Sequence, residues 1–218
     1  MVFYGKKIKV CHVIPTLRFG GAEKLVILFA KHFDPTRFEL TVATIIESGP
    51  LSADLRMMGS RHAEFHKRGL GLRLLFNLYR FFRAEKFDVV HTHLFGGDAW
   101  GRLAAWLART PVIISTEHNF NLDEGRLKHF WKWFSQGMID KEVAVSEAVK
   151  NYSIEVDKIN PRKIIVIRNG IEVERFSRLP TVHFGAPFIL ASSAAWKNRK
   201  DTSGLWMLFL KLLIVIGI

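Results

Sequence analysis

At 218 residues, the chain is long enough for one large α/β domain, or for one domain and part of a second. Hydrophobic residues make up 49% of it and charged residues 24%, which excludes a mostly disordered chain. The net charge of +12 favours a partner that carries phosphates, such as a nucleotide, a nucleic acid or an anionic membrane face. The basic residues are scattered, so each one alone is best explained as solvated surface.

Cysteine usage and hydropathy suggest a cellular compartment. A single cysteine, Cys11, excludes a disulfide within the chain, and its place in an apolar run predicts a small buried residue. Residues 1–7 hold no apolar run of signal-peptide length, and no interior run reaches the roughly 20 residues of a spanning helix. We therefore expect a cytoplasmic protein.

Short apolar runs alternate with longer helical patterns, which is typical of a parallel sheet with helices on both faces. The predicted strands are Ile8–Ile14, Leu40–Ile46, Ala63–His66, Val89–Thr92, Val112–Thr116, Glu142–Val145 and Ile164–Ile167. The predicted helices are Ala22–Phe33, Leu72–Ala84, Asp98–Ala108, Glu124–Gly137 and Glu147–Ile154, the last with Ser146 as its N-cap. Seven strands with crossover helices predict an α/β fold with a Rossmann-like, doubly wound parallel sheet.

The character of the chain changes after the seventh predicted strand. Asn169-Gly170 marks a turn, and Pro180 and Pro187 bracket a stretch without helical period. We predict a domain over residues 1–168, a linker over 169–187 and the start of a second domain over 188–218. The apolar end, Leu205–Ile218, would span only about 21 Å as a helix, which is too short to cross a bilayer.

The first predicted strand runs into a glycine pair and a helix. Gly20 and Gly21 allow a sharp turn and place no Cβ between the backbone amides and a bulky partner. The first amides of the helix and its dipole offer a seat for an anion such as a diphosphate, with Arg18 beside it. A turn that needs glycine for steric reasons alone explains the pattern equally well. The spacing lacks Gly-x-Gly-x-x-Gly, which disfavours a dinucleotide-dependent oxidoreductase.

Polar residues follow two further strands, at the edge where doubly wound sheets bind ligands. His91 and His93 end the fourth strand, and Thr116-Glu117-His118-Asn119 ends the fifth. We expect His93 and His118 to face a cleft, whereas His91 fits a hydrogen-bonded strand end equally well. His118 has the chemistry of a proton carrier or hydrogen-bond donor, with Glu117 as its orienting partner or as a surface carboxylate. No third metal ligand accompanies His91 and His93 in the pattern, so we expect no metal.

The predicted helix Glu124–Gly137 interleaves Trp131, Trp133 and Phe134 with lysines. This composition fits a helix that rests on the headgroup layer of an anionic membrane, with its lysines reaching the lipid. Ordinary packing of the aromatic residues against the sheet is the preferred explanation, because aromatic residues at helical spacing are usually core.

Taken together, these motifs resemble the GT-B glycosyltransferases and, among them, the GT4 group of retaining, nucleotide-sugar-dependent enzymes. The resemblance covers about residues 7–192, and the combination of motifs in this order is more specific than any one of them. It rests on Lys9-Val10 through Ile14, Gly20-Gly21-Ala22-Glu23, Asp88-Val89-Val90-His91-Thr92-His93, Thr116-Glu117-His118, Val145-Ser146-Glu147 and Ile167-Arg168-Asn169-Gly170-Ile171-Glu172.

The resemblance implies a metal-independent transferase with two Rossmann-like halves, of which this chain holds the N-terminal, acceptor-side half. It implies no cofactor other than a nucleotide-sugar donor, a glycan or lipid-linked acceptor of the cell envelope, and no nucleic acid. The basic charge and the aromatic residues among lysines add an anionic membrane surface on the cytoplasmic side to the expected partners. By position, it implies a catalytic role for His118, contacts to the donor diphosphate for Gly20, Gly21 and Arg18, and acceptor contacts for His91, His93, Glu117 and Asn119.

Beyond Ser192 the sequence departs from the family pattern, which continues as Gly-Arg-Leu-Glu-Lys-Gln-Lys-Gly and about another domain's length. One set of codons for Ala194–Asp201, read one nucleotide earlier behind a G, encodes that same octapeptide. We therefore hypothesise that residues 188–218 are a truncated, out-of-frame start of the donor-binding domain and that the chain alone has little activity. A non-enzymatic remnant or a membrane-surface binding module is the alternative, and the gene sequence after Ser192 tests the hypothesis.

Overall fold

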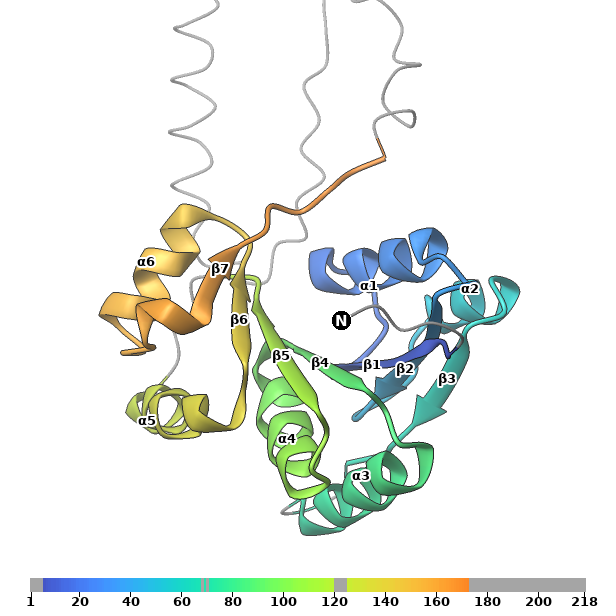
Figure 1. The fold of residues 1–218 in the computed structure, drawn as a ribbon, viewed down its shortest axis with the longest axis horizontal. Helices are drawn as coiled ribbons and strands as arrows, with labels where there is room; N and C mark the ends of the chain where they lie inside the picture. Colours follow the sequence, from blue (N-terminus) through green and yellow to red (C-terminus); the bar gives the residue numbers. More distant parts are fainter. Residues whose placement is uncertain (1–5, 68, 70, 120–124, 173–218) are drawn as a thin grey trace, which may run out of the picture. The chain divides into compact units, whose positions relative to one another are not determined.

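The computed structural model describes residues 6–172 except 68, 70 and 120–124. These residues contain a seven-stranded sheet in the order β3-β2-β1-β4-β5-β6-β7 (Figure 1). Every neighbouring pair of strands is parallel, so the predicted doubly wound α/β sheet is confirmed. The strands are β1 (Ile8–Ile14), β2 (Phe38–Thr44), β3 (Arg61–Glu64), β4 (Val89–His93), β5 (Val112–Glu117), β6 (Lys141–Ala144) and β7 (Ile164–Val166).

Helices connect the strands and cover both faces of the sheet (Figure 1). They are α1 (Gly21–His32), α2 (Ser52–Met57), α3 (Leu72–Glu85), α4 (Leu94–Leu107), α5 (Arg126–Ser135) and α6 (Glu147–Glu155), with short 3-10 turns at Gln136–Met138 and Pro161–Lys163. The predicted N-cap of α6 is confirmed, since the Ser146 hydroxyl accepts a hydrogen bond from the Val149 N–H. Helix α2 was not predicted, because six residues are too few to show a helical period.

Alternation along β1 divides the core into two layers. Cys11 and Val13 belong to a cluster that includes Leu74 and Leu78 of α3 and small residues of α4. Ile14 belongs to a second cluster, with Val26 of α1, on the opposite face. Cys11 is completely buried, as predicted. His12 lies on the same face of β1 as Ile14, so its imidazole lies in the buried layer between the sheet and α1.

Helix α4 begins at Leu94, four residues before its predicted start at Asp98, and so includes Gly96 and Gly97. A Cβ on Gly97 would lie 2.8 Å from the Val13 carbonyl oxygen, and a Cβ on Gly101 would lie 2.9 Å from Thr92. These glycines therefore let the helix lie directly on β1 and β4. Leu94, its first residue, has a φ of 58°, a left-handed conformation that side chains rarely adopt.

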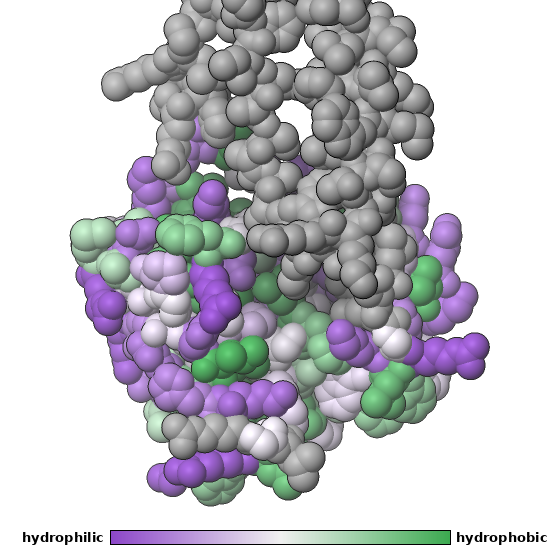
Figure 2. All heavy atoms as spheres, turned by 180° about the vertical axis from the view of Figure 1, so that it is seen from behind, coloured by the Kyte–Doolittle hydropathy of each residue, from purple (hydrophilic) through white to green (hydrophobic). Residues whose placement is uncertain are grey.

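The first compact unit of the chain ends at Ile171. Of the predicted linker over residues 169–187, all but the first four residues lie outside the described residues, and so does the whole segment 188–218. None of the helices in the described ranges is long and apolar enough to cross a membrane. Seen from behind, the described surface mixes hydrophilic side chains with smaller hydrophobic patches (Figure 2).

Candidate functional site

The carboxyl ends of β1, β4 and β5 meet at one edge of the sheet, because these strands are parallel and adjacent. The loop after β1 leads to Gly20, β4 ends at His93, and His118 follows β5 directly. The sheet order therefore brings the glycine pair and the predicted histidines to the same edge (Figure 1). Asn119 is exposed there, one residue beyond His118.

The glycine pair leaves open space at the start of α1. Gly20 is the N-cap residue, with φ of −162° and ψ of 168°, an extended conformation that any residue adopts. The backbone conformation of Gly20 therefore does not require a glycine. A Cβ on Gly21 would meet no described atom within 4 Å, and one on Gly20 would meet only the flexible carboxylate of Glu23. Within the described ranges no side chain forms a capping hydrogen bond to this helix, whose first turn begins at the open position of Gly21.

Arg18 precedes the glycine pair on an exposed part of the same loop. Its guanidinium forms an ion pair with Glu47, which follows β2. The hydrogen bond to Glu47 raises the pKa of Arg18, so the side chain stays charged. A diphosphate that used Arg18 would therefore share it with, or take it from, an existing carboxylate partner.

Three imidazoles form a hydrogen-bonded series from β1 to the end of β5. His12 Nδ1 lies 2.7 Å from His93 Nε2, and His93 Nδ1 lies 3.2 Å from His118 Nε2. His91 turns to a different partner, with its Nε2 2.6 Å from the Thr116 hydroxyl. His12 was missed by the sequence analysis because it lies inside an apolar strand. The signal that identifies it is register, since His12 pairs with His91 across the two strands.

Burial keeps these imidazoles neutral near pH 7. Desolvation lowers the pKa of His12 to about 3 and that of His118 to about 4. It also lowers the pKa values of His91 and His93 well below their ordinary value. His93 has no exposed surface, so the expectation that it faces a cleft is wrong. His118 as a whole is half-buried, whereas its Nδ1 is a buried atom with no hydrogen-bond partner among the described residues.

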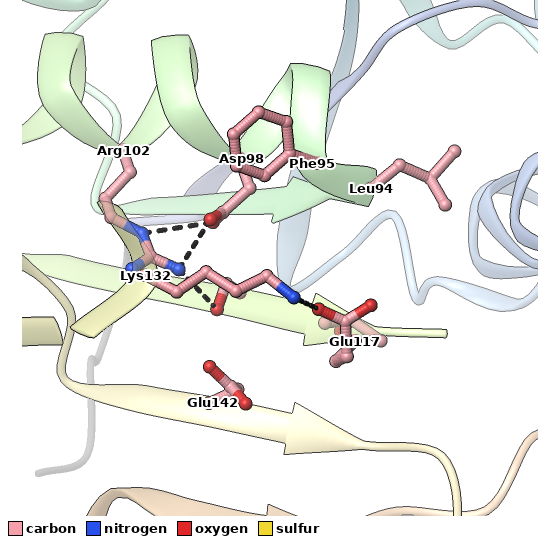
Figure 3. A pocket seen from close by; sticks show the side chains of 9 residues that line it. Leu94, Phe95, Asp98, Arg102, Glu117, Lys132 and Glu142 are labelled. Atoms are coloured by element: carbon pink, nitrogen blue, oxygen red, sulfur yellow. Dashed lines mark hydrogen bonds and ion pairs between the residues drawn. The ribbon is translucent and has the colours of Figure 1, made fainter. Parts of the chain in front are cut away.

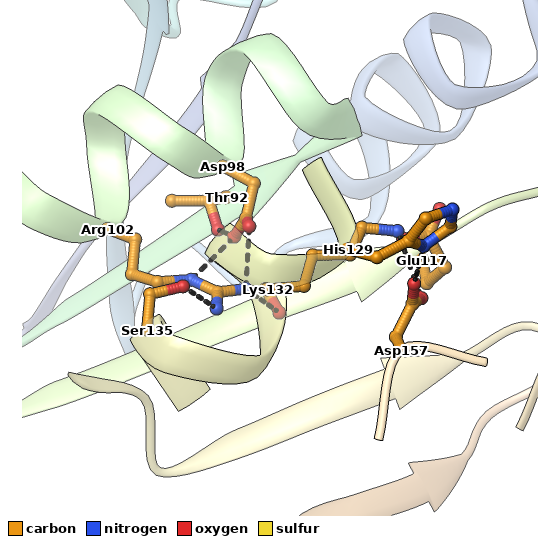
Figure 4. A network of polar contacts seen from close by, with 9 residues as sticks. Thr92, Asp98, Arg102, Glu117, His129, Lys132, Ser135 and Asp157 are labelled. Atoms are coloured by element: carbon orange, nitrogen blue, oxygen red, sulfur yellow. Dashed lines mark hydrogen bonds and ion pairs between the residues drawn. The ribbon is translucent and has the colours of Figure 1, made fainter. Parts of the chain in front are cut away.

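Glu117 is bound on the α5 side of the sheet. Its carboxylate lies 2.7 Å from Lys132 Nζ, and Lys132 lies 3.1 Å from Asp157, which in turn bonds His129 (Figure 4). Lys132 and Asp157 are almost fully buried, so this network is shielded from solvent. The structure therefore supports a role for Glu117 in fixing the end of β5 against α5, and its role as the orienting partner of His118 stays a prediction.

A second buried network ties α4 to its neighbours. Arg102 lies 2.6 Å from a carboxylate oxygen of Asp98 and donates to the hydroxyls of Ser115 and Ser135 (Figure 4). Thr92 donates to Asp98 at 2.6 Å. Charged groups buried with this many partners hold the strands and helices in one arrangement, because separating any pair would leave an unpaired charge.

Between the two networks lies a small pocket that Asp98, Arg102, Glu117, Lys132 and Glu142 help to line (Figure 3). Its cavity of about 10 Å³ has room for about one water molecule and none for a sugar. Desolvation raises the pKa of Glu142 to about 7. The substrate site is therefore not here, and the open edge at Gly21 and His118 is the better candidate.

His12, His91 and His93 each place a ring nitrogen within 4.8 Å of the others, so they form a candidate cation site. In a tetrahedral zinc site, however, two nitrogens bound at about 2.0 Å lie about 3.3 Å apart. The His12 and His93 nitrogens lie 2.7 Å apart and share a hydrogen bond, so a metal would have to break that bond. The geometry favours hydrogen bonding over metal binding, and the absence of a metal stays a prediction.

Comparisons with known proteins give the context of this site. The family model described as Glycosyltransferase Family 4 matches residues 19–175. The UDP-Gal:alpha-D-GlcNAc-diphosphoundecaprenol alpha-1,3-galactosyltransferase of Escherichia coli is 29% identical over 192 residues, which cover 82% of this chain and 48% of the relative.

Solved structures show the same fold. A glycosyltransferase from Rickettsia africae has a TM-score of 0.63 at 22% identity, over 82% of this chain and 47% of that one. Anabaena HepE in complex with UDP-glucose has a TM-score of 0.63 at 18% identity, over 77% of this chain and 45% of that one. The chain thus spans about half the length of the relatives it matches.

The buried histidines predict a protein that loses stability in mild acid. The unfolded chain takes up protons near the ordinary histidine pKa of 6.5, whereas His12 and His93 remain neutral until far lower pH. Each of these two rings therefore lowers the free energy of unfolding by about 1.4 kcal/mol for each pH unit below 6.5. Glu142 opposes this over part of the range, because its raised pKa favours the folded state as pH falls from 7.

Urea unfolding at pH 7.5 and pH 5.5 measures this effect. We expect a clearly lower free energy of unfolding at pH 5.5, because His12, His91, His93 and His118 together outweigh Glu142. The variant His12→Phe, compared at the same two pH values, should show a smaller drop. Equal or higher stability at pH 5.5 would show that these rings are not held neutral by burial.

Proposed function

The chain belongs to glycosyltransferase family 4, and from that premise we propose that it forms the N-terminal, acceptor-side half of a retaining glycosyltransferase of the GT-B fold. The donor is a nucleotide-sugar and the acceptor a glycan or lipid-linked sugar of the cell envelope. Support comes from the Escherichia coli relative, whose name gives UDP-Gal and a diphosphoundecaprenol-linked sugar, and from HepE, which was solved with UDP-glucose. No metal ion or cofactor takes part.

One observation carries the donor assignment: open space adjoins the uncapped amides of α1, at the same sheet edge as His118. The positive end of the helix dipole stabilises an anion at this position. During transfer, negative charge grows on the diphosphate as the bond to the sugar breaks, so the amides after Gly20 and Gly21 stabilise the transition state more than the ground state. Arg18 assists by sharing its positive charge between Glu47, its present partner, and the diphosphate.

His118 is the proposed catalytic residue, and its protonation state limits what it does. Because burial lowers its pKa to about 4, the ring is neutral at pH 7 and brings no positive charge to the reacting sugar. A neutral imidazole still donates one hydrogen bond and accepts another. We assign His118 to a hydrogen bond with the sugar that moves. This contact orients the anomeric carbon between the leaving diphosphate and the acceptor hydroxyl.

The acceptor residues divide into direct and indirect groups. Asn119 is exposed beside His118 and is available to an acceptor hydroxyl. His91 is half-buried and bonded to Thr116, so it shapes the edge between β4 and β5. Glu117 orients the same edge through Lys132. His93 has no exposed surface and acts on the site through His118.

The part of the relatives that this chain does not match supplies the remaining donor contacts in this proposal. Basic residues for the diphosphate and carboxylates for the sugar would come from that part. The 218-residue polypeptide alone therefore turns over nucleotide-sugar slowly or not at all. A non-enzymatic remnant would differ from this half-enzyme because supplying the other half would restore no activity.

A hybrid enzyme tests the proposed function. It joins residues 1–168 to the half of the Escherichia coli galactosyltransferase that this chain does not match. We expect transfer from UDP-galactose to a polyprenyl-diphosphate-linked sugar, and we expect His118→Ala to lower kcat about a hundredfold through loss of a positioned hydrogen bond. His66→Ala is the matched control, since His66 is an exposed imidazole on the β3 side of the sheet. A hybrid without transfer, or one indifferent to His118, would refute the proposal.

Helix α5 is the proposed contact with an anionic membrane surface. The expectation that its aromatic residues are ordinary core is wrong for Trp133 and Phe134, which are 50% and 57% exposed. Leu127 and Phe130 are also exposed, and Phe130 packs beside Trp133. Exposed Arg126 and Lys128 lie on the same helix. Apolar side chains with flanking cations are the composition of helices that lie in the headgroup layer.

Sedimentation with vesicles tests this contact. Vesicles with anionic headgroups should retain the protein, and Trp133→Ser should weaken the partition about tenfold through lost apolar burial. Phe76→Ser is the control, because Phe76 on α3 is equally exposed, at 56%, but lies apart from the α5 cations. Equal loss in both variants, or no binding to anionic vesicles, would contradict the assignment.

A further inference from the structure

Three consecutive residues, where the chain leaves β5, each bond to another element of the domain. Thr116 and His118 bond to histidines of β4, with distances between the bonded atoms of 2.6 Å and 3.2 Å. Glu117, between them, bonds instead to the Lys132 ammonium of α5, at 2.7 Å (Figure 4). The segment that carries the proposed catalytic residue is thus held both from β4 and from α5.

Helix α5, which supplies Lys132, is attached to the rest of the domain by polar groups. Its two buried residues are Lys132 and Ser135, and the Ser135 hydroxyl accepts a hydrogen bond from Arg102. No residue of α5 belongs to any hydrophobic cluster that the described residues form. The place of α5 against β5 therefore depends mainly on hydrogen bonds and ion pairs, which are directional, whereas apolar contacts are not.

Stability alone does not explain a lysine at this position. Lys132 is 3% exposed, and its ammonium lies between Glu117 and Asp157, at 2.7 Å and 3.1 Å. Taking these charges out of water is costly, and well-packed apolar residues in place of a buried ionic group often leave a protein equally stable or more stable. The ionic group does supply a fixed position, because each buried charge must stay beside its partner.

We propose that Lys132 is a positioning residue for His118. Through Glu117, Lys132 fixes the end of β5 and with it the place of His118 at the open edge, and Asp157 in turn holds Lys132. This role requires no contact between Lys132 and a substrate. The hold on His118 is a property of the chain alone, whereas its effect on sugar transfer rests on the proposed function.

Nitrogen relaxation NMR of the 218-residue protein tests this hold without any ligand. The backbone amide of His118 should be rigid, with an order parameter of about 0.85, and in Lys132→Met it should fall below about 0.6 while amides in β1 and β2 stay unchanged. Lys163→Met is the matched control, because Lys163 is also half-buried but bonds to the Gln136 and Ile139 carbonyl oxygens. A rigid His118 in folded Lys132→Met would overturn the proposal.

A second variant separates positioning from folding, because Lys132→Met alone leaves two buried carboxylates without their ammonium. Glu117→Gln, Lys132→Met and Asp157→Asn together remove all three charges. The urea midpoint should therefore fall less than in the single variant, whereas the order parameter of His118 should fall as far. A rigid His118 in this triple variant would overturn the proposal. Failure of both variants to fold would do the same, because the network would then be required for the fold itself.

The hybrid enzyme tests the consequence for transfer. Lys132→Met should lower kcat about tenfold through misplacement of His118 and leave KM for UDP-galactose unchanged. Lys163→Met should alter neither constant. A changed KM with an unchanged kcat would contradict the positioning role in transfer. A hybrid that is inactive with Lys132 in place would refute the proposed function, and the order parameter of His118 would then decide the positioning role by itself.

Discussion

The parallel pairing of β1, β4 and β5 is the constraint on which the candidate site depends. Because the three strands run in the same direction, the chain leaves each of them at one edge, and residues up to a hundred positions apart meet there. The pairing also places His12 level with His91 and lets His93 reach His118. A slip of one residue in β1 would turn His12 to the other face of the sheet and remove the imidazole series.

Two kinds of buried polar group hold this edge in place, and they differ in charge. The Asp98–Arg102 and Glu117–Lys132–Asp157 networks contain ions whose charges are balanced by close partners. The imidazole series is buried as deeply but remains neutral, because desolvation lowers its pKa values. The ionic networks bind α4 and α5 to the sheet, while the neutral series connects the interior of β1 with the proposed catalytic residue. The ionic networks thus keep the edge rigid, whereas the proposed catalytic chemistry belongs to the neutral imidazoles.

Much of this fold can be predicted from sequence, because apolar strands and crossover helices leave strong periodic signals. The bounds of β1 are predicted correctly, and the predicted fold class and family are confirmed. The start of α4 is not, because Gly97 is required by contact with Val13, a residue more than eighty positions away. The exposure of the aromatic side of α5 is not predictable from sequence either. A helical period shows that a helix has an apolar face but not whether another element covers that face.

The site is less predictable than the fold, for physical reasons. The histidines at the strand ends are visible as motifs, but the burial of His93 and the part of His12 follow from register and packing. The glycine pair is visible as a motif, but the extended backbone of Gly20 and the open space beside Gly21 are not, because both follow from how the chain packs. Contacts with a ligand define the roles proposed for Arg18, Gly20, Gly21 and His118. Contacts within the chain therefore do not reveal these roles.

The most direct test of the account is the affinity of the hybrid enzyme for UDP-galactose, measured by calorimetry in Gly21→Leu and Gly137→Leu. Both glycines are exposed, and a Cβ on either would meet no described atom within 4 Å, so neither change should alter the urea midpoint. The account predicts that Gly21→Leu weakens binding about tenfold, a loss of about 1.4 kcal/mol, because the side chain would occupy the space of the diphosphate. It predicts no change for Gly137→Leu. Unaltered affinity in Gly21→Leu would contradict the claim that the donor binds at the start of α1.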